Sequence, residues 1–183
     1  MPLLLLGLAF ASPPDPAARA SLDAGEVVIL PRQEGTVRAM ARVQASPEVI
    51  WRIVSDPHHI RASSPTVKEL LVHSDAPRGD GLRQQLLGYT VKAGWSEVRY
   101  NVIRVYDPAG GEMRWTLDGS RDNDIQATDG RFALSADPAG GTLFTYELRV
   151  ELGKAVPAWI QAELTESGIK RFLEYVQLTA PKG

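Results

Sequence analysis

Aromatic side chains offer the clearest chemistry in this sequence, and that chemistry is the binding of an apolar molecule. Tyr and Trp bring a large apolar surface together with one polar atom, which is the combination that ligand pockets use. Trp115 shares strand parity with Met113, and Tyr146 shares it with Phe144, so each aromatic belongs to an apolar strand face. The residues that we expect to line a ligand pocket are Tyr100, Trp115, Phe132, Tyr146, Trp159, Leu164, Gly168 and Phe172. Ordinary core packing is the alternative for each of them.

Arginines inside strand-like segments are the second group of candidate ligand contacts. We consider four that lie in such segments, Arg99, Arg104, Arg114 and Arg149. We expect them to face outward, because charged side chains are seldom buried without a partner. An arginine that turned inward could hold a carboxylate or phosphate group of a ligand.

The sequence gives little support for metal, cofactor or nucleophile chemistry. Its cysteine count of 0 excludes disulfides, zinc–thiolate sites, iron–sulfur clusters and cysteine nucleophiles. His58 and His59 are adjacent and would diverge on a helix, so we interpret them as part of a surface connector. The acidic run Asp122–Asp124 lacks the calcium-loop pattern and fits a solvated turn. No G-x-S-x-G, G-x-G-x-x-G or G-x-x-x-x-G-K-[ST] motif occurs, so we assign no catalytic residue, metal site or cofactor.

The composition is that of an ordinary globular chain. It has 183 residues and a mass of 20.0 kDa, with 44% hydrophobic and 23% charged residues, which suits one domain with a packed core. Lys and Arg number 20 against 22 Asp and Glu, a formal charge of −2, and this balance gives no indication of a nucleic-acid partner. The expected partner is a hydrophobic small molecule; transient membrane contact and the oligomeric state are left open.

The first residues have the pattern of a targeting segment. Leu3–Phe10 is an apolar run far shorter than a membrane span, and it ends in the A-x-A pattern Ala9–Ala11 that precedes signal-peptidase cleavage. A Pro-rich linker follows, and no Lys or Arg precedes the run. We therefore expect residues 1–20 to be a signal peptide and linker, residues 21–183 to be the domain, and the protein to be periplasmic or secreted. A short apolar anchor is the alternative. We expect no core contacts before about Leu22.

Hydrophobic periodicity predicts the elements that position the candidate residues. Glu26–Leu30 is a short edge strand that Pro31 should end, and Thr36–Val43 alternates as a half-buried strand. A helix should begin at Ser46 and end near Pro57. The predicted strands that follow, separated by Gly- and Pro-rich turns, are Val67–His73, Gly81–Val91, Ser96–Tyr106, Glu112–Leu117, Gln126–Ala136 and Thr142–Leu152. Short turns between consecutive strands predict an antiparallel meander.

The last predicted element is a long amphipathic helix. Pro157 opens about 20 residues of helix-favouring sequence with a wide apolar stripe. Leu164, Gly168 and Phe172 recur on that stripe every four residues. The glycine suggests a close approach of sheet or ligand, and a plain tolerated glycine is the alternative.

Two parts of the chain have a pattern typical of a known superfamily. The first is Val43–Trp51, followed by Pro65, and the second is Phe144–Val150 with Val156–Ile160. The first resembles the opening of the START-like (SRPBCC) superfamily, and the second resembles its final strand and the entry to its last helix. This superfamily includes the polyketide cyclase/dehydrase, coenzyme-Q-binding and birch-pollen-allergen-like families. Many members carry an aromatic residue before that proline, where this chain has Ser64.

The resemblance implies an α+β helix-grip fold. In this fold a curved antiparallel sheet of about seven strands wraps around a long C-terminal helix, with a short helical insert after the first strand. Members bind lipids, sterols, quinones or polyketides in a cavity between sheet and helix, and some catalyse cyclisation or dehydration. We expect binding and transport or sequestration of such a molecule. The alternatives are a polyketide cyclase/dehydrase-type enzyme and an interaction module whose cavity is packed shut.

Overall fold

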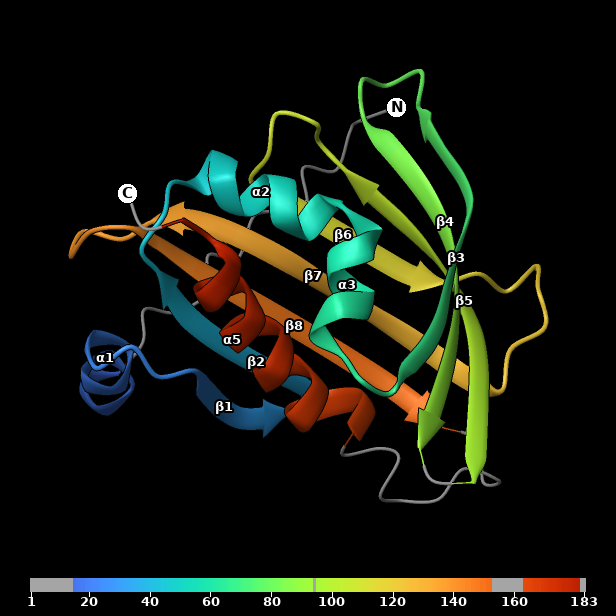
Figure 1. Cartoon of the computed structure of the whole chain (residues 1–183), viewed down its shortest axis with the longest axis horizontal. Helices are drawn as coiled ribbons and strands as arrows, with labels where there is room; N and C mark the ends of the chain where they lie inside the picture. Colours follow the sequence, from blue (N-terminus) through green and yellow to red (C-terminus); the bar gives the residue numbers. More distant parts are fainter. Residues whose placement is uncertain (1–14, 94, 153–162, 182–183) are drawn as a thin grey trace, which may run out of the picture.

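One antiparallel sheet of eight strands forms the frame of the protein (Figure 1). The computed structural model describes residues 15–93, 95–152 and 163–181. The strands are β1 Val28–Gln33, β2 Thr36–Val43, β3 Val67–Pro77, β4 Arg83–Ala93, β5 Ser96–Tyr106, β6 Glu112–Leu117, β7 Ile125–Ala136 and β8 Thr142–Leu152. Their order in the sheet is β1-β2-β8-β7-β6-β5-β4-β3. The predicted meander is therefore confirmed, and it returns to pair β8 with β2.

The sheet bends, so that β3, β4 and β5 stand across the direction of β7 and β8 (Figure 1). Side chains alternate between its two faces, as a pleated strand requires. In β5, Val98 and Val102 are buried on the concave face, whereas Arg99 is exposed on the convex face. The apolar positions read from the sequence thus gather on the inner side of the curve.

The edge strand β1 extends further than the sequence predicts. Pro31 lies inside it, and the pairing with β2 shifts register between Leu30 and Gln33. At a sheet edge a proline needs no ladder partner for its missing N–H, so it does not end the strand.

The C-terminal helix lies against the concave face of the sheet (Figure 1). A π-helical segment, η1 Glu163–Ser167, leads into α5 Gly168–Thr179. α5 buries Ile169 and Leu173 and contacts β2. The helix-grip arrangement is confirmed. The expected start of this helix at Pro157 lies outside the described residues.

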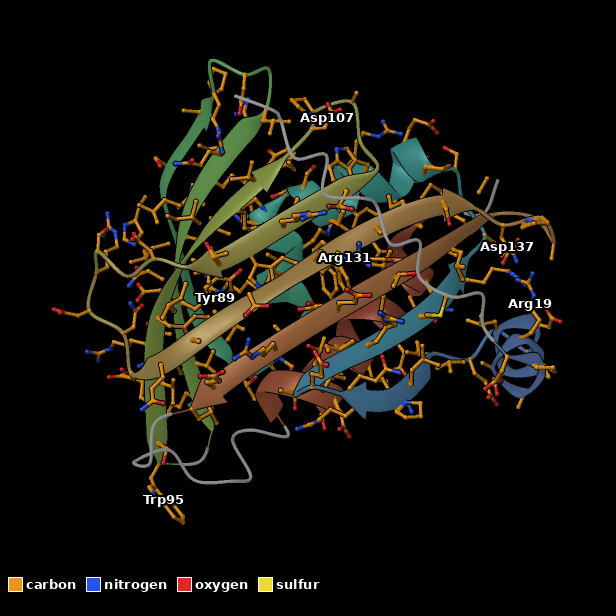
Figure 2. All side chains as sticks on the ribbon, turned by 180° about the vertical axis from the view of Figure 1, so that it is seen from behind. Arg19, Tyr89, Trp95, Asp107, Arg131 and Asp137 are labelled. Atoms are coloured by element: carbon orange, nitrogen blue, oxygen red, sulfur yellow. The ribbon has the colours of Figure 1, made fainter. Side chains whose placement is uncertain are left out.

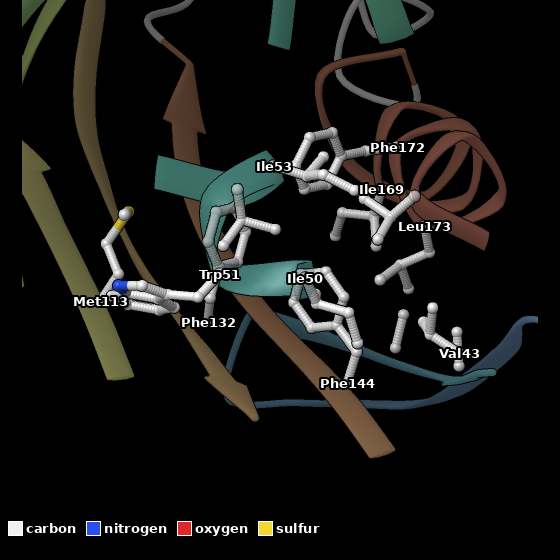
Figure 3. Packing of buried hydrophobic residues seen from close by; sticks show 14 of the residues in the cluster. Val43, Ile50, Trp51, Ile53, Met113, Phe132, Phe144, Ile169, Phe172 and Leu173 are labelled. Atoms are coloured by element: carbon white, nitrogen blue, oxygen red, sulfur yellow. The ribbon is translucent and has the colours of Figure 1, made fainter. Parts of the chain in front are cut away.

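Two short helices, α2 Pro47–Ser55 and α3 Pro57–Ser63, form the helical insert. They follow β2, the second strand, whereas the resemblance implies an insert after the first strand. The difference arises because the edge strand β1 precedes β2. Trp51 of α2 packs edge-on against Tyr106 of β5, with ring centroids 5.8 Å apart. Ile50 reaches the core beside α5 (Figure 3). In the described part of the chain no helix has both the length and the apolar character needed to cross a membrane.

A further helix, α1 Pro16–Asp23, crosses the domain boundary that the sequence places at residue 21. Ala18 and Leu22 are buried, and α1 contacts β1 and β2. The expectation that no core contact precedes Leu22 is therefore wrong, because α1 has an apolar face that the sheet edge covers. Residues 1–14 lie outside the described part, and the signal peptide stays a prediction.

A buried ion pair holds the turn between β7 and β8 to β2. The Asp137 carboxylate is fully buried and accepts a hydrogen bond from Arg42 Nε at 2.9 Å. Arg42 also pairs with Asp23 of α1 at 2.7 Å, and Arg19 of α1 lies 3.4 Å from Asp137 (Figure 2). Although burial opposes it, the Ala139 amide and Arg42 lower the pKa of Asp137, so the carboxylate stays charged.

We expect Asp137→Ala to destabilise the protein by about 3 kcal/mol, because it leaves the buried Arg42 with only Asp23 as a counter-ion. Asp107 is a matched control: it opens a second turn of identical sequence, Asp-Pro-Ala-Gly-Gly, and accepts the same local bond from Ala109, but it forms no ion pair with another described residue. Asp107→Ala should cost about 1 kcal/mol. Equal losses in urea unfolding would contradict the role given to the ion pair.

Candidate ligand-binding site

A cavity of about 130 Å³ lies between the concave face of the sheet and α5. Strands β4 to β8 supply its floor, and α3, the start of β3 and the start of α5 line the rest of it. Ser64 lines the cavity and is hydrogen bonded to Thr66 at 2.9 Å.

The structure places six of the eight predicted pocket residues on the cavity wall. They are Tyr100, Trp115, Phe132, Tyr146, Gly168 and Phe172. Leu164 belongs to η1, but its side chain is not among those that the structure describes, and Trp159 lies outside the described residues. The strand parity and the helical spacing read from the sequence therefore converge on one place.

An aromatic cluster around Phe132 forms the wall shared by sheet and helix. Phe132 stacks on Phe172 of α5 at 5.4 Å, and its ring meets Trp115 at 4.9 Å and Tyr146 at 4.6 Å. Offset-stacked and edge-on contacts of this kind add to the energy of area burial. The cluster thus holds α5 to the sheet while it leaves ring faces toward the cavity.

Trp115 keeps its position because a glycine lies opposite it. Gly130 of β7 pairs with Trp115 of β6. A Cβ atom at Gly130 would overlap the indole Cζ2 atom of Trp115 and the Glu147 carbonyl oxygen. The indole therefore needs a residue without a side chain beneath it.

A histidine joins the two helices next to the cavity. His59 Nδ1 and the Tyr175 hydroxyl are hydrogen bonded at 2.7 Å, and this bond joins α3 to α5. His58 is exposed, as expected of a surface connector, whereas His59 is half-buried. Among the described residues, no three His, Asp or Glu side chains are grouped so that they could hold a metal ion.

Three tyrosines place phenols around the cavity. Tyr89 and Tyr100 stack with ring centroids 5.0 Å apart, and Tyr146 completes the set. Burial raises the pKa of all three phenols, so at neutral pH they are uncharged hydrogen-bond donors. Their hydroxyls make no hydrogen bond with another described residue and are free to donate to a ligand.

Arg104 faces the cavity, whereas we expect from the sequence that it faces outward. It lines the cavity and is only 2% exposed. Its Nη2 donates to the Val54 carbonyl at 2.6 Å, its Nε contacts the Met113 sulfur at 2.9 Å, and its buried Nη1 has no partner among the described residues. Burial lowers the pKa of this guanidinium, because it disfavours the charged form.

Strand parity could have identified Arg104. Val98, Tyr100, Val102 and Tyr106 have the same parity in β5 and face inward. The expectation that Arg104 faces outward followed instead the general rule that charged side chains face solvent. The rule holds for Arg99, Arg114 and Arg149, which are exposed.

We expect Gly130→Ala to destabilise the protein by at least about 2 kcal/mol and to displace the Trp115 indole. Gly119→Ala is the control, because nothing lies within 4 Å of a Cβ atom there. Urea unfolding and near-ultraviolet circular dichroism would measure the two effects. A Gly130→Ala protein with unchanged stability and an unchanged spectrum would contradict the packing described.

The buried phenols also predict a loss of stability at alkaline pH. An unfolded tyrosine loses its proton near pH 10.0, whereas Tyr89, Tyr100 and Tyr146 retain theirs in the folded state to higher pH. Their contribution is complete below about pH 9 and falls as pH rises, by up to about 4 kcal/mol per pH unit for three protons. Tyr146→Phe should reduce this slope by about 1.4 kcal/mol per pH unit. An unchanged slope in that variant, measured by urea unfolding from pH 8 to 11, would overturn the assignment.

A family profile matches most of the chain. The sequence profile described as "Polyketide cyclase / dehydrase and lipid transport" matches residues 34–180. No curated protein sequence matches the chain.

Several solved structures share the fold. TTHA0849 from Thermus thermophilus is 19% identical with a TM-score of 0.62, and the match covers 80% of this chain and 99% of that one. A START superfamily protein from Mycobacterium smegmatis is 22% identical with a TM-score of 0.62 over 79% and 96% of the two chains. The Zhui aromatase/cyclase from Streptomyces sp. R1128 is 15% identical with a TM-score of 0.59 over 79% and 92%. With the profile match over most of its length, the chain belongs to the polyketide cyclase/dehydrase and lipid transport family.

Proposed function

We propose that the protein binds and carries or sequesters a hydrophobic small molecule in the cavity between the sheet and α5. The observation that carries this proposal is the aromatic-lined cavity. Six of the residues that line it are residues that the sequence predicts to line a ligand pocket. Membership of a family described by polyketide chemistry and lipid transport supports the same class of ligand.

The cavity volume limits the size of the ligand. At about 130 Å³ the cavity is smaller than the roughly 300–1,000 Å³ of most ligand pockets, and it is close to an apolar cavity of about 150 Å³ that accepts benzene. The closed form therefore suits a single ring or a short chain. A larger ligand, including a probe with two or three aromatic rings, requires α3 and α5 to move apart, and the His59–Tyr175 hydrogen bond joins these two helices.

The chemistry of the wall favours binding over proton-transfer catalysis. Among the described residues that line the cavity there is no carboxylate, imidazole or amine, the groups that most often act as general bases. The second candidate function, a cyclase/dehydrase-type enzyme, is favoured by Arg104 and the phenols. Such groups can stabilise negative charge on a ketone oxygen during an aldol ring closure that forms a carbon–carbon bond and releases water. Formation of a cyclised product from a poly-β-keto thioester would move the assignment to this candidate.

Filling the cavity tests the proposal directly. We expect Val102→Phe, on the cavity floor, to weaken binding of the neutral fluorescent probe N-phenyl-1-naphthylamine by at least about tenfold. Its stability should change by less than about 1.5 kcal/mol, because the added ring enters empty space.

Val105→Phe is the matched control, since Val105 has the opposite parity in the same strand and does not line the cavity. It should leave probe affinity unchanged. Equal affinity in both variants and the native protein would place the probe elsewhere and contradict the proposal.

A further inference from the structure

We propose that the cavity selects an amphipathic monocarboxylate, with Arg104 supplying the charge and the Tyr89 and Tyr146 hydroxyls the hydrogen bonds. This inference rests on the proposed function and names the chemical class of its ligand. It is independent of whether the bound molecule is carried or converted.

The positive charge of Arg104 has no carboxylate partner among the described residues. Asp75 acts on it through space, but that carboxylate is already held by Arg83 Nε at 2.5 Å and Gln85 Nε2 at 3.1 Å. A guanidinium buried without a counter-ion carries a large desolvation cost. An anion that entered the cavity would offset part of that desolvation cost. The empty protein should therefore bind a negatively charged ligand more tightly than an uncharged one of the same shape.

Two of the three guanidinium nitrogens of Arg104 contact the protein, but these contacts do not supply a full negative charge. Nη2 and Nε are engaged by the Val54 carbonyl at the end of α2 and by Met113. The carboxyl end of a helix contributes only about half of a negative charge. Nη1 remains a buried donor without a partner in the described part of the chain. A methionine or leucine could have filled the same space without this cost.

The hydrogen-bond donors line the same cavity as the charge. Tyr89 and Tyr146 belong to its wall together with Arg104. Burial raises the pKa of both phenols, so both hydroxyls are protonated at neutral pH, and they make no hydrogen bond with another described residue. Two O–H donors in one cavity with a buried cation form a neutralising environment for an oxyanion, whereas they leave a wholly apolar ligand with unpaired polar neighbours.

The number of charges favours a carboxylate over a phosphate monoester. One uncompensated cation matches one negative charge, while a phosphate monoester carries up to two at pH 7. The second charge would remain buried and unpaired among aromatic rings. The apolar remainder of the ligand would then lie against Phe132 and Trp115.

Matched aromatic ligands separate charge from shape. Displacement of N-phenyl-1-naphthylamine at pH 7 would give affinities for 2-naphthoate, its uncharged amide 2-naphthamide, and 2-naphthyl phosphate. For the native protein we expect 2-naphthoate to bind at least about tenfold more tightly than 2-naphthamide and more tightly than the phosphate. In Arg104→Met the preference for naphthoate over naphthamide should fall to about one. Arg99→Met, an exposed arginine of the same strand, should preserve it.

Each alternative result has one meaning. Equal binding of naphthoate and naphthamide to the native protein, or a preference that survives Arg104→Met, overturns the inference and leaves the proposed function standing. Tighter binding of the phosphate overturns the carboxylate assignment. If none of the probes binds, the proposed function itself fails.

Conservative tyrosine variants cover the case in which Arg104→Met does not fold. Tyr89→Phe and Tyr146→Phe each remove one hydroxyl and keep the ring. Each should weaken naphthoate by about fivefold and leave naphthamide within about twofold. Unchanged naphthoate affinity in both variants overturns the inference.

Discussion

The stacking of Phe132 on Phe172 is the contact on which the rest of the structure depends. It is the point where the floor of the sheet meets the C-terminal helix, at a centroid distance of 5.4 Å. Phe144 and Leu173 pack on one side of it as a close core (Figure 3). On the other side, the curve of the sheet diverges from α5 and a cavity remains. A single helix cannot fill a sheet of eight strands to both ends, so the same contact creates the core and the empty space.

Polar groups are distributed unequally around that space, and this inequality gives the cavity its chemical character. The wall near Phe132 is aromatic and includes the phenol of Tyr146 of β8, whereas Arg104, Tyr89 and Tyr100 come from the neighbouring strands β4 and β5. The cation and the phenols are costly to bury in an empty cavity, because among the described residues Arg104 has no counter-ion and no acceptor for Nη1, and the phenol hydroxyls make no hydrogen bond. A function that needed only apolar shape would not require them. Their presence accounts for both candidate functions, since the same groups bind a carboxylate or stabilise an oxyanion.

Much of the fold could be predicted because short-range patterns determine it. Alternation along β5 and β8 assigned side chains to faces, and spacing of four along α5 brought Gly168 and Phe172 to the same cavity. What could not be predicted depends on partners far apart in the sequence. Gly130 and Trp115 are neighbours only through strand pairing, and no local pattern marks the requirement.

The two Asp-Pro-Ala-Gly-Gly turns show the same limit. Asp107 and Asp137 begin identical segments and make the same local hydrogen bond. One remains exposed, while the other is buried against Arg42, 95 residues away. Arg104 is the reverse case: its parity in β5 predicts an inward side chain, and the general preference of charged residues for solvent predicts the wrong face at this candidate site.

The central claim is that an apolar ligand occupies the cavity beside Phe132, and methyl-resolved NMR tests it most directly. With N-phenyl-1-naphthylamine bound, the account predicts shifted resonances and probe contacts for the methyl groups of Val91, Val102 and Ile169, which line the cavity. The exposed methyl groups of Leu71, Val72 and Leu178 should remain unchanged. Contacts confined to those exposed residues, with the cavity methyl groups unaffected, would contradict it.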